Sequence, residues 1–242
     1  MKKPITLSRS TPLAGLGTVL SAYFAARFGN AGGGVPNPFE AEAGDISGHY
    51  AEHGTLIATS GYLYCLAAIL LLVFAAGLTT RFRESAAEDA RGWALTGLAG
   101  SAVYSVLLLL VGLLQLALVG MARREGAEDS VAALAIVWAM SIVVLVPASV
   151  PLLVGFGMAG RRSGQLSGLL TGFALAGALL GLAPPPEVVG PLSPVAASLL
   201  FVLSELQPWL LVIWMVGTAF VIRRSLAESE PEQLETVEEA GA

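Results

Sequence analysis

The chain alternates between long apolar blocks and short polar segments. A helix that crosses a bilayer needs about 20 mainly apolar residues, because each residue advances about 1.5 Å through about 30 Å of hydrocarbon. Six blocks approach or exceed this length, and the first is the shortest. They cover residues 13–28, 56–78, 93–121, 131–156, 164–183 and 195–222. The pattern predicts an all-α, polytopic bundle of about six transmembrane helices, formed by one membrane-embedded domain over residues 1–224.

Charged residues lie almost entirely between these blocks. Only 13% of the residues are charged and 55% are hydrophobic, whereas about 25% of a soluble domain is charged. Lipid is therefore the expected surroundings, and the lack of a basic patch excludes nucleic-acid binding. Lysine occurs only at Lys2 and Lys3 beside many arginines, alanines and glycines. This bias is typical of GC-rich bacterial genomes and favours a bacterial plasma membrane.

The first block also has features of a signal peptide. Basic residues precede a short apolar core, and the small residues Gly29-Asn30-Ala31 form a possible cleavage site. Arg27 lies awkwardly close to that site, so we favour an uncleaved first helix and keep the signal peptide as the alternative.

The basic residues of the short loops predict the orientation, because cytoplasmic loops are enriched in arginine and lysine. With the N-terminus inside, the outer segments hold only Arg27, Arg123 and Arg124. The cytoplasmic segments then hold Lys2, Lys3, Arg9, Arg81, Arg83, Arg91, Arg161, Arg162, Arg223 and Arg224. An even number of spans places the C-terminus in the cytoplasm as well.

Two polar segments differ in what they predict. The residues from Asp45 to Thr55 have a helical pattern and lead directly into the second span. The tail over residues 225–242 carries six glutamates and no basic residue. Such a stretch buries too little apolar surface to offset its ordering entropy, so it is expected to be a disordered cytoplasmic tail.

Small residues recur every four positions in two spans, a pattern that lets helices approach closely in lipid. The third span has Gly97, Ser101 and Ser105 in this rhythm, and Pro147 and Pro151 are expected to bend the fourth. The fifth span has Gly164, Gly168, Gly172 and Ala176, with Gly177 and Gly181 on a neighbouring face. We expect packing within one chain, with homo-oligomerisation through Gly164, Gly168 and Gly172 as the alternative.

The two histidines form the clearest candidate for chemistry. His49 and His53 are four residues apart, so both rings lie on one helical face, and Asp45 extends that face by another turn. With Glu52 they spell H-x-x-E-H, in which two histidines bind zinc and the glutamate acts as general base. A further acidic ligand could come from Glu125, Glu128 or Asp129. We favour solvated interfacial histidines, and keep a metal site without catalysis and a metalloprotease as alternatives.

Glu205 is the second candidate, because it lies well inside the sixth block, where a charged side chain is costly. Gln115, Ser141, Tyr62 and Tyr64 lie at comparable depth. They suggest a polar pocket that opens outward and holds a ligand or a proton. The alternative is a neutral Glu205 that is hydrogen-bonded to Gln115 and purely structural.

Two stretches resemble a known family. One is Ile46-Ser-Gly-His-Tyr-Ala-Glu-His53 with the following Gly61–Leu78 span, and the other is Val146–Arg162. Both are similar to segments of a family of uncharacterised small polytopic membrane proteins of actinobacteria. This resemblance implies a helical fold of about six spans and no assigned activity. His53 matches a position of that family, whereas His49 replaces a more usual aromatic residue and Glu205 has no counterpart.

These observations favour a structural, interaction or small-ligand-binding membrane component over an enzyme. A transporter or proton-coupled carrier that uses Glu205 remains an alternative, as does a metal-binding protein or metalloenzyme of the outer face that uses His49, Glu52 and His53. No resident cofactor is expected, apart from zinc or another transition metal in this last case.

Overall fold

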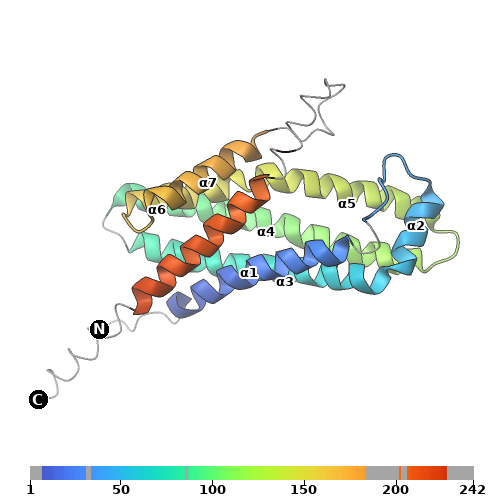
Figure 1. The fold of residues 1–242 in the computed structure, drawn as a ribbon, viewed down its shortest axis with the longest axis horizontal. Helices are drawn as coiled ribbons and strands as arrows, with labels where there is room; N and C mark the ends of the chain where they lie inside the picture. Colours follow the sequence, from blue (N-terminus) through green and yellow to red (C-terminus); the bar gives the residue numbers. More distant parts are fainter. Residues whose placement is uncertain (1–6, 31–33, 85–86, 184–201, 203–205, 228–242) are drawn as a thin grey trace, which may run out of the picture.

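The computed structural model describes residues 7–30, 34–84, 87–183, 202 and 206–227, and these residues are helices joined by short turns, without a strand. The all-α prediction is confirmed for this part of the chain. The helices are α1 (Leu7–Gly29), α2 (Ala43–Glu52), α3 (Gly54–Arg83), α4 (Glu88–Ala122), α5 (Glu128–Ala148), α6 (Val150–Arg162), α7 (Gly168–Gly181) and a C-terminal helix, Leu206–Ala227. Figure 1 shows an elongated bundle in which α1, α3 and α4 follow the long axis and α2 lies at one end.

Four stretches of the described chain are long and apolar enough to cross a membrane. They are α3, α4, the continuous stretch Glu128–Arg162 formed by α5 and α6, and the C-terminal helix. α7 is apolar but has only 14 residues, and α1 is not among the four. The C-terminal helix continues to Ala227, three residues into the predicted tail. The remaining tail and most of residues 195–205 lie outside the described residues.

Charges at the helix ends match the helix dipoles, which favour acidic residues in first turns and basic residues in last turns. α4 begins with Glu88 and Asp89, and α5 begins with Glu128 and Asp129. The last turns of α3 and α6 carry arginines, including Arg81. The polar segments thus define the helix ends as well as separating the apolar blocks.

The fourth span continues through a single junction residue between its two prolines, where a bend was expected: Ser149 keeps helical dihedrals (φ −73°, ψ −19°) and its N–H donates to the Leu145 carbonyl. α5 ends at Ala148 and α6 begins at Val150, with Ser149 between them. Pro147 and Pro151 have no N–H to donate to the helix, which frees carbonyl groups in the preceding turns. The Ser149 hydroxyl donates to the carbonyl of Val146, three residues earlier, at 2.7 Å.

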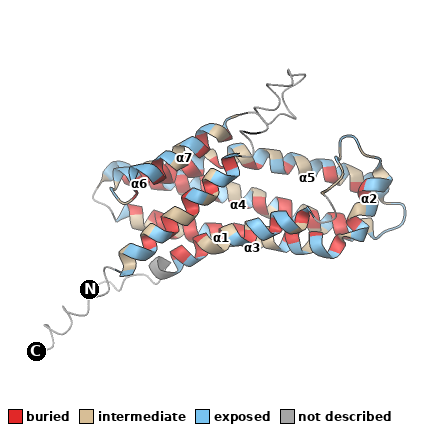
Figure 2. Ribbon diagram, in the orientation of Figure 1, coloured by how far each residue is buried: buried red, intermediate tan, exposed pale blue. Residues whose placement is uncertain are grey.

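An aromatic cluster forms the centre of the larger core. Trp214 of the C-terminal helix is fully buried and stacks on Phe156 of α6, with ring centroids 6.4 Å apart and planes 13° apart. Phe74 of α3 meets the same indole edge-on at 6.4 Å. Figure 2 shows buried residues mainly on the sides of the helices that face one another. Large apolar side chains such as Leu13 and Tyr62 are exposed. An apolar outer surface is what a lipid environment requires.

Glycines allow α4 to approach two neighbours at backbone contact. A methyl group added at Gly112 would lie 2.5 Å from the carbonyl oxygen of Gly61 on α3. A methyl group at Gly155 of α6 would lie 2.5 Å from the Cα of Gly97. Gly97, Ser101 and Ser105 are all buried, so this predicted small-residue face does pack within the chain.

In the fifth predicted span, the glycines that were expected to pack within the chain differ in their surroundings. Gly164 precedes α7 in a turn, where its φ of 69° requires glycine, and α7 begins only at Gly168. No atom of the described chain lies within 4 Å of a methyl group placed at Gly168 or Gly172. Within the described chain these three glycines have no packing neighbour, so packing within one chain and homo-oligomerisation both stay predictions for them, whereas Gly177 and Gly181 do face neighbouring helices.

The first helix packs into the bundle along its length. Thr11 contacts the backbone of Gly77 so closely that no side chain would fit there, and Gly15 lies against Phe74 of α3. Cleavage after this segment would expose the matching face of α3. The choice between an uncleaved helix and a signal peptide stays a prediction.

We predict that Gly112→Ala destabilises the protein, because the added methyl group overlaps the Gly61 carbonyl oxygen. Overpacking of this kind costs about 1–3 kcal/mol. Gly120→Ala on the same helix is the matched control, because nothing lies within 4 Å of its added methyl group. Thermal unfolding of both variants in detergent would measure the difference. Equal melting temperatures would show that α3 and α4 do not cross at these glycines.

Candidate functional site

α2 is held across one end of the bundle by its apolar face. Ile46 and Tyr50 are fully buried in a second, smaller core together with Ile57 of α3, Leu118 of α4 and Val131 of α5. The helix leads into α3 through a single residue, His53, whose φ of −100° and ψ of 14° end the helical path. The predicted helical segment is therefore present, and a break at His53 separates it from the second span.

The two histidine rings lie beside each other at this break. Their centroids are 4.9 Å apart and their planes are inclined by 62°. The Nε2 atom of His49 is buried and has no hydrogen-bond partner among the described residues. Burial, and secondarily the nearby His53, lowers the pKa of His49, although Glu52 opposes the shift. A lowered pKa favours the neutral imidazole.

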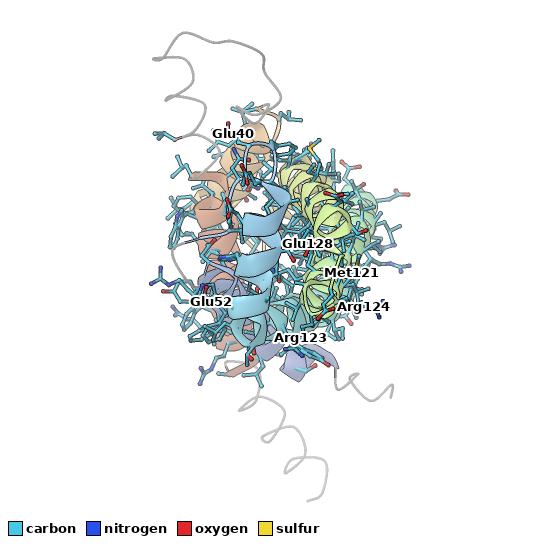
Figure 3. The ribbon with its side chains drawn as sticks, turned by 90° about the vertical axis from the view of Figure 1, so that its right-hand side faces the viewer. Glu40, Glu52, Met121, Arg123, Arg124 and Glu128 are labelled. Atoms are coloured by element: carbon cyan, nitrogen blue, oxygen red, sulfur yellow. The ribbon has the colours of Figure 1, made fainter. Side chains whose placement is uncertain are left out.

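The acidic residues predicted to accompany the histidines are exposed. Asp45 and Glu52 both face solvent, and Glu128 lies at the start of α5. Figure 3 looks onto this end of the bundle, where Glu40, Glu52 and Glu128 are labelled. Within the described chain, no three His, Cys, Asp or Glu residues are arranged to hold a metal ion. Asp45 and Glu52 therefore remain predictions as ligands.

The residues predicted to surround Glu205 do not lie together: some are buried between helices and one is exposed on the outside of the bundle. Gln115 is buried between helices, whereas Tyr62 is 69% exposed on the outside of α3. Tyr64 packs against the larger core, and Ser141 donates to the carbonyl of Val137 in its own helix. Glu205 itself lies outside the described residues. The pocket around Glu205 stays a prediction, and Tyr62 faces away from the bundle interior.

Gln115 instead takes part in a contact between three helices. The Ser60 hydroxyl of α3 lies 2.9 Å from Oε1 of Gln115 and 2.8 Å from the carbonyl oxygen of Ala25. A methyl group at Gly29 would lie 3.0 Å from the same hydroxyl, so α1 must be small where it meets this pair. Buried polar groups of this kind need partners. The contact of Gln115 with Ser60 therefore supports a structural role for Gln115, in which it connects α4 to α3.

Two further polar contacts were not found from the sequence. Gln207 of the C-terminal helix donates to the Ser149 hydroxyl at 2.7 Å, directly at the junction of α5 and α6. Arg81 of α3 donates to Oε1 of Gln165 at 2.8 Å and to the Ser225 hydroxyl at 2.6 Å. A serine between two prolines was the available signal for the first contact. The partners of Arg81 lie 84 and 144 residues away, and no local pattern indicates them.

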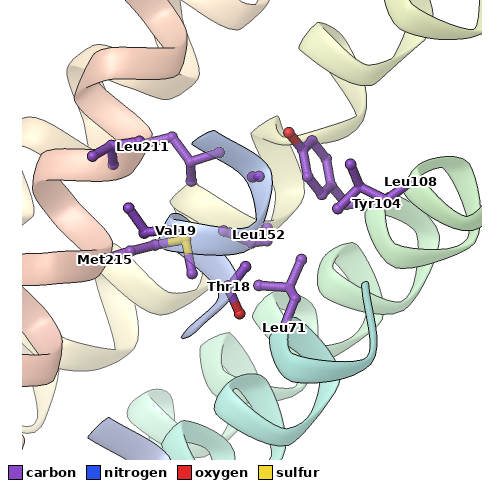
Figure 4. A pocket seen from close by; sticks show the side chains of 10 residues that line it. Thr18, Val19, Leu71, Tyr104, Leu108, Leu152, Leu211 and Met215 are labelled. Carbon is purple, nitrogen blue, oxygen red and sulfur yellow. The ribbon is translucent and has the colours of Figure 1, made fainter. Parts of the chain in front are cut away.

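A small apolar pocket lies at mid-length of the bundle. Its volume is about 60 Å³, and five helices contribute to it (Figure 4). Its lining consists of Thr18, Val19, Ala22, Leu71, Tyr104, Leu108, Leu152, Leu211, Val212 and Met215. Thr18 donates its hydroxyl to the carbonyl of Ala14 in the same helix. The pocket therefore offers mainly hydrocarbon to an occupant.

Comparison with known proteins gives no relative. No known protein family matches the chain, and neither a curated protein nor a solved structure is similar to it. The likeness to the actinobacterial membrane proteins therefore stays a prediction. The function has to be argued from the residues themselves.

Proposed function

We propose that the chain is a multi-pass protein of a bacterial plasma membrane with six spans and both termini in the cytoplasm. α1 and α7 would be the two spans beyond the four long apolar stretches. Along the chain the proposed spans alternate in direction between the two ends of the bundle, with α5 and α6 counted as one span, as Figure 1 shows. The close packing of α1 on α3 supports a place for α1 among the spans.

The charges at the two ends support this orientation. The end with α2 carries three arginines among the described residues, beside seven acidic residues: Glu40, Glu42, Asp45, Glu52, Glu125, Glu128 and Asp129. Among the residues whose side chains the structure describes, the opposite end carries three acidic residues, Glu84, Glu88 and Asp89, beside seven arginines: Arg81, Arg83, Arg91, Arg161, Arg162, Arg223 and Arg224. The arginine-rich end is the cytoplasmic one by the usual bias of bacterial membrane proteins.

Thiol labelling tests this topology. In a Cys65→Ala background, which removes the single cysteine, we expect a membrane-impermeant maleimide to label a Glu125→Cys variant in intact cells. A Glu84→Cys variant should react only after permeabilisation. The reverse pattern would invert the orientation, and labelling of both variants in intact cells would contradict the proposed spans between them.

The function that the geometry supports best is that of an interaction component which self-associates through α7. Gly168, Gly172 and Ala176 form an exposed face with no described atom within 4 Å of methyl groups at the two glycines. Glycine inside a helix costs about 1 kcal/mol relative to alanine. Because nothing in the described chain offsets this cost, a helix of a second copy is the proposed partner. The exposed glycine face is the observation that carries this proposal.

We predict that the purified protein is a homodimer in mild detergent and that Gly168→Leu/Gly172→Leu makes it monomeric, because leucine fills the face between the two α7 helices. Light scattering after size exclusion would measure the mass. Gly120→Leu is the control, since its position on α4 is also exposed and open. A monomeric wild type, or a dimer that persists in the double variant, would contradict self-association through α7.

The apolar pocket favours a second candidate function, the binding of a lipid-like molecule. Its volume of about 60 Å³ suits a methyl branch or the end of a hydrocarbon chain, because engineered apolar cavities of about 150 Å³ take a whole benzene. Leu71 and Tyr104 lie near the middle of α3 and α4, so the pocket is at mid-membrane depth in the proposed topology. At this depth the available ligand is hydrocarbon.

We predict that a diazirine-bearing fatty acid labels the pocket residues and that Ala22→Leu reduces this labelling severalfold by filling the space. The same substitution should raise stability by about 1 kcal/mol, since an empty cavity costs about 24 cal/mol per Å³. Ala26→Leu, one turn along α1 and exposed, is the control. Equal labelling of both variants would show that the probe does not enter this pocket.

A further inference from the structure

The two histidines occupy the single connection between the end helix and the bundle. His49 belongs to the last turn of α2, and His53 is the residue between α2 and α3. From this juxtaposition we propose that His49 and His53 together bind one divalent transition-metal ion, with zinc as the best match. The proposal concerns the α2 end of the bundle and does not depend on self-association through α7.

The spacing of the rings fits a shared ion. Zinc lies about 2.1 Å from a ligating histidine nitrogen and prefers tetrahedral angles. Two imidazoles that share such an ion have ring centroids about 5 Å apart. The rings of His49 and His53 have centroids 4.9 Å apart. The helix therefore already presents the two rings at the separation that a chelate needs.

The state of the nitrogen atoms also suits a metal. Nε2 of His49 is buried without a partner in the described chain, and a buried polar atom in that condition is costly. A bound ion would satisfy it. Histidine binds metals only as the neutral imidazole, through the nitrogen that carries no proton.

The surroundings favour a cation but supply few further ligands. Acidic residues predominate at this end, which raises the local concentration of cations. Asp45 and Glu52 are exposed, and the described chain contains no group of three potential ligands. The remaining coordination positions would therefore belong to water, which predicts a reversible site that is weaker than a structural zinc site.

A metal bound by His49 and His53 would restrain the connection between α2 and α3. It would link the last turn of α2 to the residue where the helical path ends, and so fix the direction in which α2 leaves α3. Tyr50, next to His49, is buried in the small core with α4 and α5. Metal binding would therefore restrain the position of α2 over these two helices.

The test is a calorimetric titration of the tag-free, full-length protein with zinc in detergent at neutral pH. We expect one zinc per chain, and at least about tenfold weaker binding in His49→Ala and in His53→Ala. Even partners that only orient a metal ligand contribute about 10–100-fold in affinity. His49→Gln and His53→Gln provide the same test with side chains of similar size, should the alanine variants fail to fold.

The sharpest control keeps two histidines but moves one of them. Ala51→His/His53→Ala places the rings two residues apart, on opposite sides of α2. Loss of zinc binding in this variant, with binding retained in Glu52→Gln, would support the chelate. The proposal is overturned if wild type binds no more zinc than the His49→Ala/His53→Ala variant, or if the relocated pair binds zinc as tightly as wild type.

Discussion

Close approach of helix backbones is the constraint on which this bundle depends. In lipid, helices gain little by burying apolar side chains against each other, because the hydrocarbon around them is equally apolar. α4 meets this constraint on two sides, through Gly112 against Gly61 of α3 and through Gly97 against Gly155 of α6. The dispersion contacts of the larger side chains, such as the stacking of Phe156 on Trp214, form only once these backbones are close.

Buried polar contacts then determine how the remaining helices are arranged around α4. Ser60 and Gln115 connect α3 to α4 and also reach the backbone of α1 at Ala25. Arg81 connects α3 to Gln165, before α7, and to the C-terminal helix. An unpaired polar group is costly where no water is available. The buried contact of Ser60 with Gln115 and Ala25 therefore favours one arrangement of its helices, whereas the contacts of Arg81 are only partly buried.

The features that could be predicted are those fixed by local spacing. Long apolar runs predicted helices that the structure places over residues 54–83 and 88–122. The four-residue spacing of His49 and His53 predicted two adjacent rings, which the structure contains. The same helical geometry separates Tyr62 from Tyr64, because residues two apart lie on nearly opposite faces. Equal depth in the membrane was therefore a poor criterion for a shared pocket.

The features that could not be predicted depend on which helix faces which. Glycines at four-residue spacing indicate a face that can pack closely, but they do not indicate which helix packs on it. The face at Gly97 contacts α6, whereas the face at Gly168 and Gly172 contacts no described residue. Gly164 also fits this spacing, yet it is required by a turn. Gln207 meets Ser149 across 58 residues, and such pairing follows only from the assembled bundle.

The two ends of α5 contact different parts of the bundle, so α5 links α2 to the C-terminal helix. Its outer end packs with Tyr50 of α2 through Val131. Its other end meets α6 at Ser149, whose hydroxyl accepts a hydrogen bond from Gln207 of the C-terminal helix. A displacement of α2 would therefore be passed along α5 both to α4, on which α5 packs, and to the C-terminal helix at Ser149.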